Sequence, residues 1–270
     1  IWLAKFKGIH TNIFATRVKH RSPKLRPLLK QFYRSIYASI SSIYTVSEAD
    51  SEGINTILGP NSIPIIKVLG NPRYDTVMKS SEDLSLQKTD SVLEREKRII
   101  IGSAHVEDDD FLIPALADLM EEHPDMKVLY APHEPSRKAI DRISKRFKKL
   151  GYRNTIFAKK NDMTLSSDRL VIVGVVGVLS KLYWQGIIAF IGGGLSTGIH
   201  NVMEPAIAKL PVLFGPKYHH AHEAEELLKF GGGFCINGQN EFHDKIIQLI
   251  NDRRYLKLAS LAATDVIHKN

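Results

Sequence analysis

Residues 190–216 contain the residue types of an anion-binding site. An apolar segment runs into three glycines, 192–194, which let the backbone turn sharply and let a ligand approach without interference from a Cβ atom. Ser196 and Thr197 follow and can add hydroxyl donors. We expect the next helix to start at 198–201, so that its free N–H groups and positive dipole end would suit a phosphate.

An acidic residue, Glu204, falls one turn into that expected helix. A carboxylate weakens phosphate binding unless it points elsewhere, whereas the vicinal hydroxyls of a sugar can donate to it. The pattern therefore favours a nucleotide, with its phosphate at the helix start and its ribose on Glu204. The glycine spacing 192-x-194-x-x-x-198 also resembles a variant dinucleotide fingerprint. Because it opens only a short helix deep in the chain, NAD(P) is the less favoured ligand.

Short runs rich in Ile and Val must position these residues, and they alternate with amphipathic stretches. Runs of this kind are typical of strands buried on both faces, and their alternation with helices predicts an α/β fold with parallel sheets. The expected strands are 11–15, 42–46, 65–70, 98–103, 127–132, 155–158, 170–174, 187–194 and 211–216. The expected helices are 24–40, 47–57, 108–122, 135–150, 200–209, 220–230 and 239–251.

A polar segment without strands, 79–97, divides this pattern. We therefore expect the C-terminal part of one Rossmann-like domain over 1–80, a connection over 81–96, and a complete Rossmann-like domain over 97–270. The last helix could return to the first domain. Half an α/β domain would leave sheet edges bare, so we expect further chain before Ile1.

Ligands of open parallel sheets bind beyond the carboxyl ends of the strands. Six of the expected strands end in segments that carry Gly, Pro or His. Gly and Pro alone could simply end a strand, but six such ends together favour a ligand-binding cleft. Asp108 to Asp110 are expected to cap and start a helix, since acids suit its positive end. His105 is expected to be a turn residue or to support a neighbour. The six ends are 70–73, 102–105, 132–134, 174–177, 192–194 and 215–216.

The chain has 37 basic and 29 acidic residues among 270, a net charge of +8, and residues 17–34 are basic without any acid. Such a face fits nucleic acid, an anionic membrane surface or an anionic substrate, or else a solvated helix. The single cysteine, Cys235, excludes an internal disulfide. No spacing of His and Cys indicates zinc, and no apolar run reaches the length of a membrane span.

Residues 192–234 resemble the 3-deoxy-D-manno-octulosonic acid (Kdo) transferases of Gram-negative bacteria, and further similar stretches keep the same order along the chain. The resemblance implies a GT-B glycosyltransferase, with two Rossmann-like domains facing a cleft. Such an enzyme would move Kdo from CMP-Kdo to a lipid A precursor at the cytoplasmic face of the inner membrane. The supporting stretches are 15–22, 70–75, 102–110, 130–136 and 175–194.

The resemblance also implies roles for single residues. His133 would contact the CMP phosphate, and Arg73 would stabilise charge in the transition state. Residues 17–34 would face anionic lipid. No metal, cofactor or nucleic acid is expected. The donor-binding residues would be Ser103, Pro132, His133, Gly177, Val178, Leu179, Gly193, Gly194, Ser196, His200, Asn201, Val202, Met203 and Glu204.

Two departures from the family pattern qualify this prediction. Pro72 stands where the family has a Leu, and the family's general-base Glu, in an N-terminal Gly-Glu motif, has no counterpart here. We therefore expect the base to lie upstream of Ile1 and this chain alone to be inactive. The alternatives are another GT-B enzyme that uses a UDP- or GDP-sugar, and a non-catalytic module that binds nucleotide or docks on a membrane.

Overall fold

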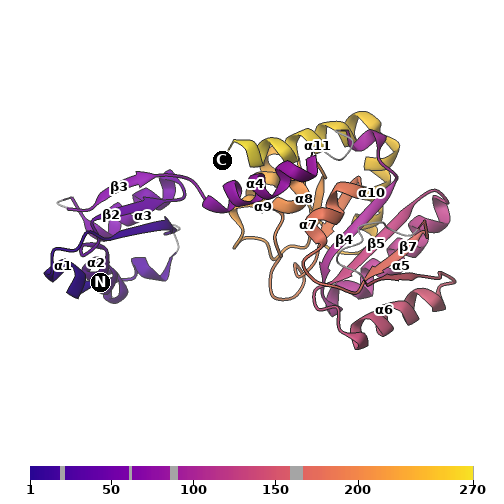
Figure 1. Cartoon of the computed structure of the whole chain (residues 1–270), viewed down its shortest axis with the longest axis horizontal. Helices are drawn as coiled ribbons and strands as arrows, with labels where there is room; N and C mark the ends of the chain where they lie inside the picture. Colours follow the sequence, from indigo (N-terminus) through magenta and orange to yellow (C-terminus); the bar gives the residue numbers. More distant parts are fainter. Residues whose placement is uncertain (19–21, 61–62, 86–90, 159–166, 270) are drawn as a thin grey trace. The chain divides into compact units, whose positions relative to one another are not determined.

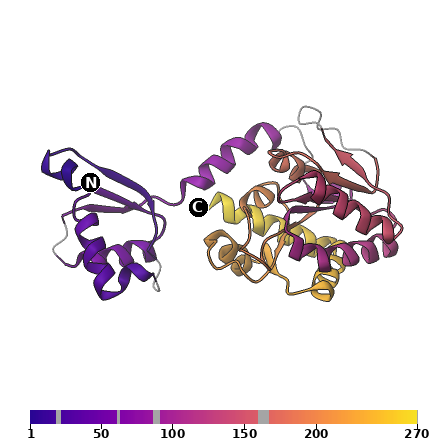
Figure 2. The same cartoon turned by 90° about the horizontal axis from the view of Figure 1, so that it is seen from below.

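A computed structural model describes residues 1–18, 22–60, 63–85, 91–158 and 167–269. The chain divides into two compact units, Ile1–Thr76 and Val77–Lys269 (Figures 1 and 2). Among the described residues, every strand pair in both units is parallel, so the predicted α/β class is confirmed. The described residues of the expected connection, 81–96, belong to the second unit.

The first unit has a three-stranded sheet in the order β1-β2-β3. Its small core lies where Val18, Ile43, Ile54 and Ile57 meet, all almost fully buried. The strands are β1 (Asn12–Thr16), β2 (Ser42–Thr45) and β3 (Ile65–Val68). The helices are α1 (Trp2–Phe6), η1 (Pro23–Leu25), α2 (Pro27–Tyr37) and α3 (Glu48–Leu58).

The second unit has a seven-stranded sheet in the order β10-β9-β8-β4-β5-β7-β6. The chain runs outward from β4 to β5 and on to the edge strand β6, and β7 then fits between β5 and β6. The chain returns to β8 beside β4 and continues outward to β9 and β10. This is the Rossmann strand order with one added edge strand, and its topological switch point lies between β4 and β8. The strands are β4 (Arg98–Ala104), β5 (Lys127–Pro132), β6 (Thr155–Phe157), β7 (Leu170–Val173), β8 (Ile188–Ile191), β9 (Val212–Phe214) and β10 (Gly233–Cys235).

The helices of this unit pack around the sheet and against one another. α5 contacts α10 and α6, whereas α11 contacts α8, α9 and α10 (Figures 1 and 2). Of the described helices, none is both long and apolar enough to cross a bilayer. Helix α4 (Pro72–Ser85) begins in the first unit and ends in the second. The other bounds are η2 (Val92–Glu94), α5 (Val106–Glu122), α6 (Arg137–Lys149), α7 (Leu179–Leu182), η3 (Tyr183–Gln185), α8 (Met203–Ile207), α9 (His222–Phe230), α10 (Gln239–Asn251) and α11 (Arg253–His268).

The largest local error in the sequence prediction concerns α8. We expected a helix over 200–209 that starts at 198–201, but α8 begins at Met203 and has five residues. Gly198 has φ +122°, which is outside the helical region, and the Asn201 side chain accepts a hydrogen bond from Met203 N at 3.0 Å. The backbone at Gly198 and the side-chain turn at Asn201 together delay the helix start. The sequence prediction also missed α4, α11 and strand β10.

Candidate ligand-binding site

Three histidines meet at the carboxyl edge of the second sheet, at and beside its switch point. His105 follows β4, His133 follows β5, and His200 lies in the loop that leaves β8. The His105 Nε2 and His200 Nε2 atoms are 2.7 Å apart. The His133 ring stacks on His105 and His200, with centroid separations of 4.7 and 4.2 Å. We call these three residues the histidine trio.

A serine of the β8 loop fixes the orientation of His105. Ser196 Oγ lies 3.0 Å from His105 Nδ1 and donates its own proton to the Gly193 carbonyl at 3.3 Å. Ser196 Oγ therefore accepts from Nδ1–H, which leaves the His105 Nε2 lone pair for the Nε2–H of His200. Burial, and then the neighbouring His133, lower the pKa of His200 to about 4, so its imidazole is neutral at physiological pH.

A buried carboxylate joins the two strand ends. Asp108 is fully buried at the start of α5, and its Oδ2 accepts from His105 N and Gly193 N at 2.8 Å each. Its Oδ1 has no hydrogen-bond partner among the residues that the structure describes. Burial is the main cause of the raised pKa of this carboxyl. The prediction that Asp108 to Asp110 cap and start a helix is confirmed in part: Asp108 closes a capping box with His105 and lies with Asp109 in the first turn, but the helix begins earlier, at Val106, and Asp110 lies beyond that turn.

The glycines after β8 are explained by packing of the protein against itself. A Cβ at Gly192 would lie 2.3 Å from the Ser103 carbonyl oxygen, and one at Gly194 would lie 2.6 Å from the backbone of Gly215. Gly193 has φ +87°, in the left-handed region. The amides of Gly193, Ser196, Gly198, Ile199 and His200 already bond to protein oxygens. These glycines therefore allow the loop after β8 to pack closely against the ends of β4 and β9. We had expected them to allow the close approach of a ligand.

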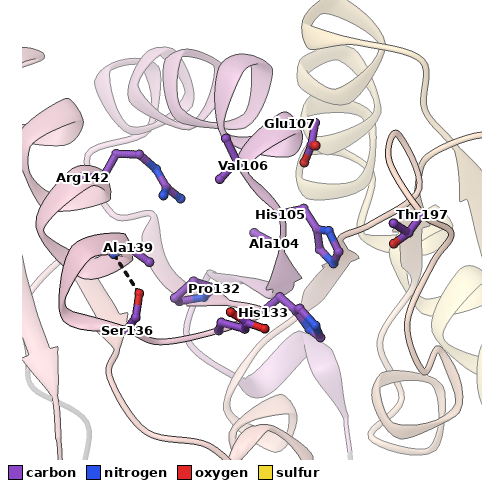
Figure 3. Close-up of a pocket in the computed structure, with 11 residues that line it drawn as sticks. Ala104, His105, Val106, Glu107, Pro132, His133, Ser136, Ala139, Arg142 and Thr197 are labelled. Carbon is purple, nitrogen blue, oxygen red and sulfur yellow. Dashed lines mark hydrogen bonds between the residues drawn. The ribbon is translucent and has the colours of Figure 1, made fainter.

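The main pocket, of about 530 Å³, lies between the start of α5 and the start of α6 (Figure 3). The rings of His105 and His133 line one side, and Arg142 extends from α6 on the other. The Nε and Nη2 of Arg142 donate to Oδ2 of buried Asp109 at 3.0 and 2.8 Å, so the guanidinium is held in place. The residues that line the pocket are Ala104, His105, Val106, Glu107, Pro132, His133, Glu134, Ser136, Ala139, Arg142 and Thr197.

Glu204 lies outside this pocket, in a small separate pocket lined also by Ser80, Ser81 and Trp184. It is half-buried, and its Oε1 accepts from Asn201 Nδ2 at 3.1 Å. The structure thus brings Asn201 and Glu204 together through a local hydrogen bond.

The other predicted residues divide into groups. His133, His200, Ser196, Gly193 and Pro132 lie in or next to the trio and main pocket. Four do not offer side chains to that pocket, because they are buried in packing or lie beyond β7 at the start of α7: Val202, Met203, Val178 and Leu179.

Three residues remain. Gly177 has φ +79° beside α7, Ser103 has φ +53° at the end of β4, and Arg73 is exposed at the start of α4 in the first unit. Their roles stay predictions.

Sequence reasoning missed three residues as site residues: His105 and Arg142, which line the pocket, and Asp108, which is buried behind it. His105 stood in the list of strand ends but was expected only to support a neighbour, whereas it is the centre of the trio. Asp108 was expected only to start a helix, and it also holds Gly193. Arg142 carried no signal, because it reaches the site through an ion pair with a residue far away in the sequence.

No protein-family model matches the chain. Over 245 residues it is 24% identical to the 3-deoxy-D-manno-octulosonic acid transferase of Rickettsia typhi, which covers 90% of this chain and 51% of that protein. The chain thus spans about half the length of the curated relatives it matches.

Two solved structures show the same fold. The C-terminal CMP-Kdo binding domain of WaaA from Acinetobacter baumannii has a TM-score of 0.57 at 19% identity and covers 72% of this chain and 98% of that domain. The UDP-GlcNAc 2-epimerase from Neisseria meningitidis bound to UDP-GlcNAc has a TM-score of 0.65 at 15% identity, covering 99% of this chain and 71% of that one. The chain is therefore similar in sequence to Kdo transferases, as residues 192–234 indicated, and has an α/β fold of the GT-B type.

Proposed function

We propose that this chain is the part of a Kdo transferase that binds the nucleotide-sugar donor, CMP-Kdo, and that the whole enzyme transfers Kdo to a lipid A precursor. One observation carries the proposal. In a chain similar to Kdo transferases over 90% of its length, polar side chains from three strand ends meet at the switch point of a Rossmann-order sheet, where such sheets bind their ligands.

The pocket suggests how the donor would be held. His133 is exposed at the pocket wall, and its ring can donate a hydrogen bond to a phosphate oxygen. Glu107 and Glu134, also exposed in this pocket, would repel phosphate and accept from sugar hydroxyls instead. We therefore place the phosphate near His133 and the hydroxyl-rich parts of the donor towards the carboxylates. The family resemblance assigns the ribose to Glu204, whose pocket of about 10 Å³ must widen to admit it.

In the proposed reaction, a carboxylate upstream of this chain takes the proton of an acceptor hydroxyl, whose oxygen attacks C2 of Kdo. The bond from C2 to the phosphate oxygen breaks, and CMP leaves with its electron pair. His133 and Arg73 would stabilise the charge that develops on the phosphate. An Arg at position 73 supplies a fixed positive charge with a planar set of donors. The proposed reaction uses no metal.

The first unit suggests how the enzyme would meet a membrane, and we propose the cytoplasmic face of the inner membrane. Large apolar side chains of α1 and α2 are exposed, with Leu28 at 90%, Trp2 at 52% and Phe32 at 51%. The rings of Trp2 and Phe32 are in edge contact, so these residues form one surface. Basic residues on the same two helices could attract anionic lipid. Those described are Lys5, Lys30 and Arg34, whereas Lys19, His20 and Arg21 of the basic stretch lie outside the described residues.

Isothermal titration of the protein with CMP and with UDP tests the proposed donor. We expect CMP to bind more tightly, and His133→Ala to weaken CMP binding about tenfold or more, the loss expected for a hydrogen bond to a charged group. His243→Ala is the matched control, because its ring pairs with Glu122 at 3.1 Å on α5, away from the pocket lining. Tighter binding of UDP than of CMP would contradict the proposal and favour a UDP-sugar enzyme.

A further inference from the structure

We propose that the histidine trio, His105, His133 and His200, binds a divalent transition-metal ion of the zinc class. Each ring offers one nitrogen, and these three nitrogens all lie within 4.8 Å of one another. The residues come from three different strand ends, so the cluster is a product of the sheet topology and not of sequence neighbours. Imidazole nitrogen is a preferred ligand of Zn²⁺, Co²⁺, Ni²⁺ and Cu²⁺.

The spacing of the nitrogens is close to that of a tetrahedral site. Zn–N bonds of about 2.0–2.1 Å place two ligand nitrogens about 3.3 Å apart. The His105–His200 pair, at 2.7 Å, must open slightly, and no pair has to close by more than about 1.5 Å. Because the His133 ring is stacked on the other two, it must also turn about its side-chain torsions until its ring nitrogen, and not its face, points at the ion. The His105–His200 hydrogen bond is the contact that a metal ion would replace.

The surroundings of His105 are those of a metal ligand. Histidines that bind metals almost always donate their other ring N–H to a nearby acceptor, which orients the ring. Here Ser196 Oγ accepts from Nδ1 of His105 and is itself bonded to the Gly193 carbonyl. Asp108 ties the backbones of His105 and Gly193 together. The ring of His105 is therefore already held by the protein, with Nε2 directed towards the other two histidines, before any ion binds.

The charges around the pocket do not oppose a cation. Glu107 and Glu134 line it and are both exposed. Arg142, the basic residue that lines it, is paired with buried Asp109. Three protein ligands leave the fourth position of a tetrahedral ion for a water molecule, and the ion takes no part in the proposed transfer reaction.

Metal titration of the chelator-treated protein tests the proposal, with no nucleotide present because His133 has a role in both proposals. We expect one Zn²⁺ per chain by calorimetry and intense visible bands of tetrahedral Co²⁺. Each of His105→Ala, His133→Ala and His200→Ala should lower Zn²⁺ affinity by at least about tenfold, since even the loss of an outer partner of a ligand costs about that much.

A second group of histidines, His219 and His220 before α9 and His222 at its first position, supplies the matched control. His222 lies near Glu225 and Glu226, at 3.7 Å from each, so this region is the natural rival for added metal. His222→Ala should leave the Zn²⁺ affinity and the Co²⁺ spectrum unchanged.

The proposal would be overturned if the protein bound no Zn²⁺. It would also be overturned if Zn²⁺ binding were lost in His222→Ala but kept in His133→Ala. His133 is exposed, so its Ala variant is expected to fold, which circular dichroism checks. A separate CMP titration of the metal-free protein keeps a failure here distinct from a failure of the proposed donor site.

Discussion

The end of β4 and the loop before α8 both present polar side chains at the carboxyl side of the second sheet, but they are held in different ways. At the end of β4, Asp108 and His105 bond to residues 85 and 95 positions away in the sequence. In the loop before α8, Asn201 bonds to Glu204, three positions away. The first network exists only once the sheet has formed, whereas the second needs one turn of chain. Substitutions in the first should therefore affect the stability of the whole unit.

The largest expected effect is that of Asp108→Ala. It would leave the buried amides of His105 and Gly193 without their acceptor, at about 1–3 kcal/mol for each buried donor. Burial disfavours the charged form of Asp108, as its raised pKa indicates, so removing the carboxylate also removes an unfavourable contribution. We therefore expect a net loss of about 2–5 kcal/mol in the free energy of unfolding. Chemical denaturation measures it.

The Asp108→Asn variant sharpens this test. Asn keeps one oxygen that can accept from both amides and removes the buried charge, so we expect it to lose less than half as much stability as Asp108→Ala. Equal losses in the two variants would show that the charge, and not the acceptor, joins the strand ends.

A second test compares two glycines. Gly194→Ala would place a methyl group 2.6 Å from the backbone of Gly215, which must shift, and we expect a loss of about 1–3 kcal/mol or more. At Gly177 there is open space for a Cβ, but φ is +79°, so Gly177→Ala should cost about 1 kcal/mol from backbone strain alone. Thermal unfolding of both variants checks the order, and a larger loss at Gly177 would contradict our account of the glycines.

The parallel α/β fold could be predicted because its signals are local. Runs such as 98–103 and 170–174 are largely apolar and do not alternate between apolar and polar residues, which predicts strands buried on both faces. Strands β4 and β7 are indeed buried on both faces. The strand-end argument also placed His105, His133 and the glycines on one edge of the sheet.

The partner of Arg142 could not be identified, because Asp109 lies far away in the sequence. The late start of α8 had a local cause, the backbone at Gly198 and the hydrogen bond from Met203 N to Asn201 Oδ1. Helix α11 was also missed, although it packs closely, with Gly232 against its Ala263.

A smaller effect is expected for ligand binding at Glu204. If this carboxylate accepts from a ribose, Glu204→Ala should weaken CMP binding by about 1–3 kcal/mol, the usual cost of losing a charged hydrogen bond. Calorimetry of CMP binding measures the change. The unfolding free energy of the same variant should change little, because Glu204 is only half-buried. Unchanged CMP affinity would exclude the ribose role and leave the trio pocket as the whole of the proposed donor site.

The smallest expected effect is that of Asn201→Ala, and it separates the two regions most directly. Asn201 Oδ1 accepts from Met203 N in a side-chain turn just before α8, and its Nδ2 donates to Glu204. Loss of one such part-buried hydrogen bond costs about 1 kcal/mol, well below the loss expected at Asp108. Because the pair is local, hydrogen exchange should rise at α8 while the amides of His105 and Gly193 keep their protection. If protection is lost at those two amides as well, the loop and the end of β4 form one cooperative network, and our distinction between them is wrong.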